Sequence, residues 1–157
     1  MATQTGLRNL PGMKHIAVMI VDDHARVRQG LRTFFSTCPD LRVVAEAANG
    51  EEALAWCVLA RPDVVVMDMM MPVMDGPTAT GRIREACPGS QVIALSSFGD
   101  PEEVRRALDA GATTYVPKDS SPETLVEAIR QAYRGRDATI PRPGDPARGG
   151  QRSARRP

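Results

Sequence analysis

Residues 61–77 read Arg61-Pro-Asp-Val-Val-Val-Met-Asp-Met-Met-Met-Pro-Val-Met-Asp-Gly-Pro77, an apolar run that ends on a carboxylate and passes into a turn. Residues 64–67 are mostly β-branched, which predicts a short strand buried on both faces, as in the middle of a parallel sheet. Asp68 follows this run at once, and Asp75-Gly-Pro77 predicts a loop followed by a helix. Asp68 is therefore expected at the carboxyl end of a buried strand, where ligands bind in open parallel sheets.

The rest of the chain alternates in the same way between apolar runs and amphipathic stretches. Further strands are predicted at residues 16–21, 41–47, 91–96 and 113–116. Helices are predicted from about Val27 to near Cys38, and at residues 51–60, 77–86, 101–110 and 122–135. Five strand–helix units in succession predict an α/β fold, a doubly wound (βα)5 parallel sheet with helices on both faces. The expected strand order is 2-1-3-4-5.

One domain is expected at residues 15–135, between a flexible leader at residues 1–14 and a tail at residues 136–157. The tail is rich in Pro, Gly and Arg and lacks apolar periodicity, so it is predicted to be disordered. The tail contains six arginines and only two aspartates, so it is basic and the rest of the chain is mildly acidic. A basic tail can contact nucleic acid, but this one has no aromatic residue for base stacking, which favours a solvated tail.

Composition argues against several classes of protein. A net charge of +1 gives no bulk reason to bind nucleic acid or an anionic membrane. No apolar run approaches the ~20 residues of a membrane span, and the first 13 residues lack the apolar core of a signal peptide. Three widely spaced cysteines without a Cys-x-x-Cys motif indicate neither a disulfide framework nor a zinc site. A cytoplasmic protein without a membrane partner is expected.

Carboxylates from two strands should meet at one edge of the predicted sheet. Asp22 and Asp23 end the first strand and Asp68 ends the third, and these two strands are neighbours in the expected order. Such a cluster repels itself unless some of its pKa values rise or a cation binds, and the cation that suits oxygen ligands completed by water is Mg²⁺. His24, next in the chain, is interpreted as a helix-start residue rather than a ligand.

The same edge should carry a hydroxyl and an ammonium group. Ser96 ends the fourth strand and Lys118 follows the fifth. A metal and a lysine would neutralise the oxygens of a transferred phosphoryl group, to which the hydroxyl would donate a hydrogen bond. A carboxylate can be the nucleophile, and Asp68 is assigned that role because Asp22 and Asp23 are better placed to hold the metal.

Four motifs together resemble the receiver domain of two-component response regulators. They are Val21-Asp-Asp-His24, Val66-Met-Asp-Met-Met-Met-Pro-Val-Met-Asp-Gly76, Ala94-Leu-Ser-Ser97 and Gly111-Ala-Thr-Thr-Tyr-Val-Pro-Lys-Asp119. The resemblance covers residues 16–135 and implies a flavodoxin-like fold. It also implies a protein that is not an enzyme in the usual sense, but a phosphoacceptor that promotes its own phosphorylation and dephosphorylation.

The resemblance further implies a role for each site residue. Asp68 would accept a phosphoryl group from a sensor histidine kinase. Asp23, Asp68 and the backbone carbonyl of Met70 would ligate Mg²⁺ directly, with Asp22 assisting through water. Ser96 would be the switch hydroxyl, Tyr115 the aromatic residue whose rotamer follows it, and Lys118 the partner of the phosphate. The face formed by the fourth helix and fifth strand would allow a homodimer.

The downstream output stays open. Lys118-Asp119 resembles the LuxR/FixJ-type subgroup, whose members usually carry a helix-turn-helix module, yet no such module follows Gly135 in this sequence. One alternative is a transcription regulator that contacts DNA through its basic tail or a dimer. Another is a phosphatase of the haloacid-dehalogenase type, which typically needs an acid two residues after the nucleophile, where this chain has Met70.

Overall fold

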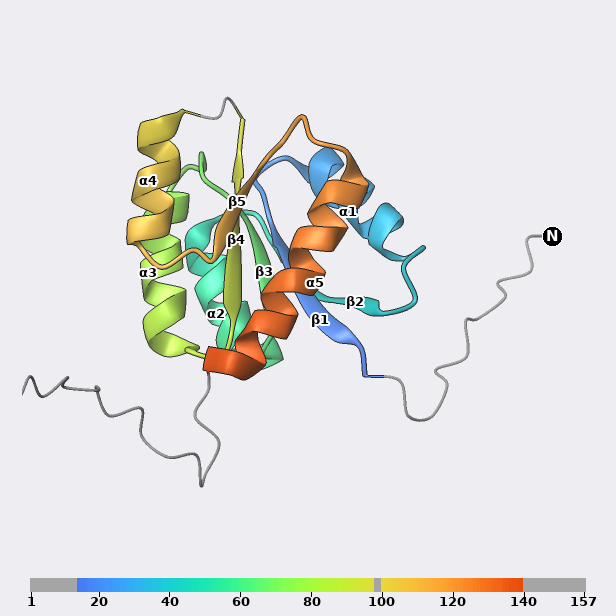
Figure 1. Ribbon diagram of the computed structural model, residues 1–157. Helices are drawn as coiled ribbons and strands as arrows, with labels where there is room; N and C mark the ends of the chain where they lie inside the picture. Colours follow the sequence, from blue (N-terminus) through green and yellow to red (C-terminus); the bar gives the residue numbers. More distant parts are fainter. Residues whose placement is uncertain (1–13, 98–99, 140–157) are drawn as a thin grey trace, which may run out of the picture.

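The computed structural model describes residues 14–97 and 100–139, in which five strands alternate with five helices (Figure 1). The strands are β1 (Ile16–Val21), β2 (Leu41–Ala47), β3 (Val64–Asp68), β4 (Gln91–Ser96) and β5 (Thr114–Pro117). The helices are α1 (Ala25–Phe35), α2 (Gly50–Ala60), α3 (Gly76–Ala86), α4 (Pro101–Asp109) and α5 (Pro122–Thr139). None of the helices in these ranges has the length and apolar content needed to cross a membrane.

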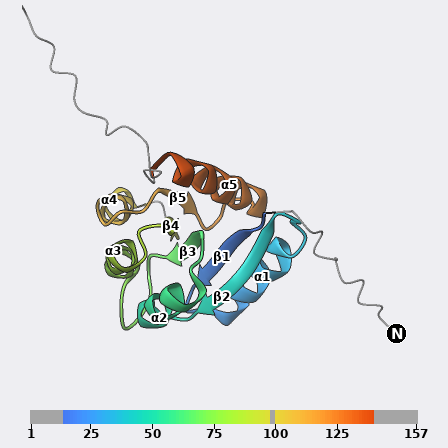
Figure 2. The ribbon, with the colours of Figure 1, turned by 90° about the horizontal axis from the view of Figure 1, so that it is seen from below.

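The strands form one sheet in the order β2-β1-β3-β4-β5, and every neighbouring pair is parallel. The predicted fold class and strand order are therefore confirmed. Figure 2 shows α1 and α5 on one face of the sheet and α2, α3 and α4 on the other. All carboxyl ends of the strands consequently lie at the same edge.

Strand β3 lies in the middle of the sheet, and all five of its residues are buried. Its side chains alternate between the two faces, as strand geometry requires. Val65 and Met67 belong to the core cluster under α2, α3 and α4, while Val64 and Val66 belong to the cluster under α1 and α5. Asp68 is thus fixed at the end of a strand that is packed on both sides.

Three helices begin where the sequence predicts, each at a residue whose side chain accepts a hydrogen bond from a backbone amide. Asn49 caps α2, Asp75 caps α3 and Asp100 caps α4. Such caps satisfy amides that have no partner inside the helix. These caps fix the first turns of α2, α3 and α4.

Helix α5 extends to Thr139, beyond the predicted end at Gly135. Arg136 in this extra turn forms an ion pair with Asp63, at the start of β3. That tertiary contact outweighs the weak stop signal of a single glycine. The predicted leader and tail lie outside the described residues, except for residue 14 and residues 136–139.

Candidate functional site

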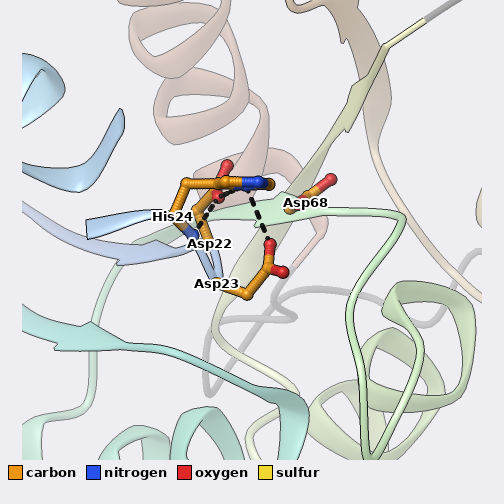
Figure 3. Close-up of side chains that lie close together, drawn as sticks. All are labelled: Asp22, Asp23, His24 and Asp68. Carbon is orange, nitrogen blue, oxygen red and sulfur yellow. Dashed lines mark hydrogen bonds and ion pairs between the residues drawn. The ribbon is translucent and has the colours of Figure 1, made fainter. Parts of the chain in front are cut away.

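The three carboxylates expected to meet do so at the carboxyl edge of the sheet. Strands β1 and β3 pair as far as Val21 and Met67, so the residues that follow, Asp22 and Asp68, lie next to each other. Asp22, Asp23, His24 and Asp68 each offer a ligand atom, and these atoms all lie within 4.8 Å of one another (Figure 3). The strand order therefore creates the cluster from segments more than forty residues apart in the chain.

Burial strengthens the repulsion between the carboxylates of this cluster, because little water screens their charges. Asp22 and Asp68 are almost completely inaccessible to solvent, whereas 29% of the Asp23 side chain is exposed. Lys118 supplies the positive charge, with its Nζ 2.8 Å from Asp22 Oδ2 and 3.1 Å from Asp68 Oδ2. One lysine does not balance three carboxylates, so the site retains a negative excess that attracts a cation.

The pKa values of the paired groups reflect this environment. Burial raises the pKa of the Asp68 carboxyl, and the nearby charge of Asp22 adds to this effect, while the Met70 amide and Lys118 oppose it. For Lys118, burial alone would lower the pKa, but the hydrogen bonds and charges of Asp22 and Asp68 outweigh burial and raise it. Lys118 therefore stays charged at neutral pH.

The loop after β3 shapes the surroundings of Asp68. The Met70 amide donates to Asp68 Oδ1 at 3.1 Å, and the Gly76 amide donates to the Met69 carbonyl at 3.2 Å. A Cβ at position 76 would lie 2.5 Å from the Asp68 carbonyl oxygen, so this close approach requires glycine. Val73 has a φ of 69°, a left-handed conformation that is costly for a β-branched residue.

The remaining predicted site residues lie on the neighbouring strands. Ser96 is buried at the end of β4, and its carbonyl accepts a hydrogen bond of 2.8 Å from the Lys118 amide. Tyr115 in β5 is not part of the carboxylate cluster, and 41% of its surface is exposed. The Met70 side chain is also exposed, so only its backbone belongs to the site.

His24 is the residue that sequence reasoning did not place in the cluster. It caps α1, as a helix-start residue should, but its side chain makes no capping hydrogen bond. Instead, Nδ1 lies 3.1 Å from Asp22 Oδ1 and 3.1 Å from Asp23 Oδ1 (Figure 3). The signal in the sequence was its position directly after two acids, and the His24 amide also donates a hydrogen bond of 2.8 Å to Asp22 Oδ1.

The donor set fits a small divalent cation. Asp22, Asp23 and Asp68 provide oxygen atoms, and the partly exposed Asp23 gives access from solvent. Mg²⁺ prefers carboxylate and carbonyl oxygens and keeps several water ligands, which a partly open site permits. These residues therefore form an acidic pocket suited to a metal ion.

A comparison with protein families matches residues 18–130 to the response regulator receiver domain. Among curated proteins, response regulator protein VraR of Staphylococcus aureus is 41% identical over 126 residues. The match covers 80% of this chain but only 60% of VraR, so the chain spans less than two thirds of that relative's length.

Solved structures agree with this result. A LuxR-family two-component response regulator from Aurantimonas sp. SI85-9A1 superposes with a TM-score of 0.74 at 36% identity, covering 78% of this chain and 87% of that one. CheY in a CheX–CheY–BeF₃–Mg²⁺ complex from Borrelia burgdorferi gives a TM-score of 0.69 at 29% identity, covering 75% and 89%. Both therefore share the overall fold of this chain.

Proposed function

This chain belongs to the response regulator receiver domain family, and on that premise we propose that Asp68 accepts a phosphoryl group from a sensor histidine kinase. The observation that carries the proposal is the contact of Lys118 with both Asp22 and Asp68 inside a buried acidic cluster. A nucleophilic carboxylate, two further acids and a fixed ammonium group are the parts that phosphoryl transfer onto aspartate needs.

The transfer step uses these residues in distinct roles. An Asp68 oxygen forms a bond to phosphorus while the bond from phosphorus to the histidine nitrogen of the kinase breaks and that nitrogen keeps the electron pair. Lys118 then exchanges its contact with the Asp68 carboxylate for one with a phosphoryl oxygen. The Met70 amide, which already donates to Asp68 Oδ1, holds the carboxylate in one orientation.

We propose Mg²⁺ as the cofactor. Asp23, Asp68 and the Met70 carbonyl would bind it directly and Asp22 would bind it through water. When bound, it would neutralise the oxygens of the incoming phosphoryl group. The Borrelia neighbour, whose complex contains BeF₃ and Mg²⁺, supports this assignment by similarity.

Phosphorylation would act as a switch. The new charge and acceptor oxygens at Asp68 would draw the Ser96 hydroxyl toward them, and Ser96 is already tied through its carbonyl to the Lys118 amide. Tyr115, which is exposed in the unphosphorylated arrangement, would turn inward into the space that Ser96 leaves. The phosphoryl group needs only to shift the balance between two arrangements a few kcal/mol apart.

A homodimer is the first proposed output of the switch. Tyr115 on β5 and Leu108 on α4 are both exposed and would form part of a homodimer face. Transcription regulation is the second candidate output, favoured by the similarity to a LuxR-family regulator. A gel-shift assay at physiological salt tests it, because binding through a basic tail alone should vanish with moderate salt.

The test of the main proposal is incubation with acetyl phosphate and Mg²⁺, followed by intact-mass and Phos-tag analysis. Wild-type protein should gain one phosphoryl group, and Asp68→Asn should gain none. The matched control is Asp75→Asn, which changes an exposed aspartate in the same loop and should leave the gain intact. A phosphoryl group that persists in Asp68→Asn shows that the acceptor is another residue, and steady release of phosphate from a small phosphoester favours a phosphatase instead.

A further inference from the structure

Helix α2 presents an apolar face to solvent. On its inner side, Ala53 and Cys57 are fully buried in the core cluster. On its outer side, Trp56, Val58 and Leu59 are exposed, and 76% of Leu59 is accessible to solvent. A surface helix normally carries polar residues away from the core, and a helix that is apolar all round is normally covered on both sides. The outer side of α2 therefore has the composition of a contact surface.

The exposed apolar side chains are concentrated on this helix. Seven large apolar side chains are exposed within the described ranges, and three of the seven are Trp56, Val58 and Leu59. Ala55, one turn before Leu59, is exposed as well. Residues three and four apart lie on the same side of a helix, so Ala55, Val58 and Leu59 form a continuous outer strip with Trp56 beside it. Single exposed apolar residues are common, whereas a contiguous group marks a site of interaction.

Charged residues at the two ends of the outer strip indicate which partner covers it. Glu51 is exposed in the first turn of α2, and Arg61 is exposed at the carboxyl end of the helix. Neither side chain forms an ion pair with another of the described residues. The two residues are ten positions apart, or about 15 Å along a helix. A surface with an acid at one end, a base at the other and apolar residues between them is complementary to itself in a two-fold contact.

A two-fold axis beside Cys57 would place the α2 helices of two copies antiparallel. Ala55 of one copy would then lie opposite Leu59 of the second copy, so that the outer strips cover each other. Glu51 of each copy would lie at the end of the other helix that carries Arg61, and two ion pairs would flank the apolar contact. The helix dipoles favour the same orientation, because the positive end of each helix lies beside the negative end of the other.

We propose that α2 is the contact surface of a homodimer in which the outer strips of two copies pack antiparallel. This contact is separate from the proposed dimer face of β5 and α4, because α3 lies between α2 and α4 (Figure 2). It includes no residue of the acidic pocket, so the dimer forms without phosphorylation. One helix from each copy covers less than a standard interface of roughly 1,600 Å², which predicts a weak, concentration-dependent dimer.

Sedimentation velocity of the full chain, with a chelator and without a phosphodonor, measures the association. Between about 5 and about 500 μM, the mass of wild type should rise from that of a monomer toward that of a dimer. Leu59→Ser should raise the dissociation constant about tenfold or more. Leu108→Ser is the matched control, because it removes an exposed leucine from α4, and it should leave the dissociation constant unchanged. A wild type that stays monomeric, or association that persists in Leu59→Ser, would overturn the proposal.

An exchange of charges tests the antiparallel orientation. Glu51→Arg alone and Arg61→Glu alone each place like charges at both ends of the contact and should weaken association about threefold or more. An equimolar mixture of the two variants restores opposite charges at both ends, so it should associate more tightly than either variant alone. A mixture of Glu123→Arg and Arg26→Glu, which changes net charge equally on the other face of the sheet, should show no such gain. Equal gains in the two mixtures would contradict the proposed contact.

Trp56 provides an optical measurement, because it is the single tryptophan of the chain. Packing beside the outer strip should reduce its exposure, so its emission should shift to shorter wavelength as the protein concentration rises. This shift should give the same dissociation constant as sedimentation and should be absent in Leu59→Ser. Association without a change at Trp56 would place the contact on another face and overturn the proposal.

Discussion

Asp68, the proposed phosphoacceptor, has an environment that lowers the stability of the folded protein. It is buried, it faces Asp22, and Lys118 compensates it only in part. Because burial raises its pKa in the folded protein, the stability linked to its proton is present below the unfolded pKa and is lost as the pH rises through the folded pKa. At neutral pH the ionised group therefore opposes folding.

Asp68→Asn should accordingly stabilise the metal-free protein at pH 7. We expect the free energy of unfolding to rise by about 1 kcal/mol and the Tm to rise by several degrees, as measured by thermal unfolding in the presence of a chelator. The gain should shrink as the pH falls into the acid range. A variant that is less stable than wild type at pH 7 would show that the contact with Lys118 outweighs the cost of burial.

The loop between β3 and α3 contains a residue in a strained backbone conformation. Val73 has a positive φ and is exposed, so its side chain contributes little packing to offset the conformational cost. Val73→Gly should raise the free energy of unfolding by roughly 0.5–1 kcal/mol in urea denaturation.

Val58→Gly is the control for this change, because Val58 is also exposed but lies inside α2. Glycine there should lower the free energy of unfolding by about 0.5–1 kcal/mol. Equal losses in the two variants would mean that the conformation at Val73 carries no strain.

Helix α3 begins at Asp75, whose carboxylate accepts a hydrogen bond of 2.8 Å from the Thr78 amide. Hydrogen bonding to the Thr78 side chain, and then to the Thr78 amide, lowers the pKa of Asp75. The contribution of Asp75 to stability is therefore present above the unfolded pKa and is lost as the pH falls through the folded pKa. Asp75→Ala should lower the free energy of unfolding by about 1 kcal/mol at pH 7, and by progressively less as the pH falls. Asp75→Asn, which keeps a hydrogen-bond acceptor, should lower the free energy of unfolding less and without this pH dependence, as measured by parallel urea titrations. If the loss for Asp75→Ala did not change with pH, the carboxylate of Asp75 would not act as the cap.

For the whole molecule, patterns of residue type were sufficient to predict the sheet and its edge. Continuous apolar runs such as that of β3 predicted buried parallel strands. The five strand–helix units predicted a doubly wound sheet, and the order 2-1-3-4-5 expected of one such fold is the order observed. The meeting of Asp22 and Asp68 then followed from topology alone.

Three features of the structure were not predicted from the sequence, because they depend on the direction of side chains and on tertiary contacts. The ring of His24 contacts Asp22 and Asp23 through Nδ1, a side-chain arrangement that no periodicity encodes. The contact of Lys118 with Asp22, in addition to Asp68, depends on distances across the sheet edge. The extra turn of α5 depends on an ion pair between Arg136 and Asp63, which are 73 residues apart in the chain.

Metal binding should be visible as stabilisation of the entire domain. An ion that binds only the folded state adds about 2.7 kcal/mol to the free energy of unfolding when its concentration is 100 times its Kd. The Tm of wild type should therefore rise with Mg²⁺ and saturate, while Asp23→Asn should show a much smaller rise at the same ionic strength. An identical rise in both proteins would indicate general screening of charge rather than a site.

The most direct test of the account locates the phosphoryl group on the chain. Wild-type protein treated with acetyl phosphate and Mg²⁺ is reduced with borohydride, which converts a phosphorylated aspartate to homoserine, and its peptides are then sequenced by mass spectrometry. The account predicts homoserine at position 68 and unmodified aspartate at positions 22, 23 and 75. Homoserine at any of those three positions, with Asp68 unchanged, would contradict it.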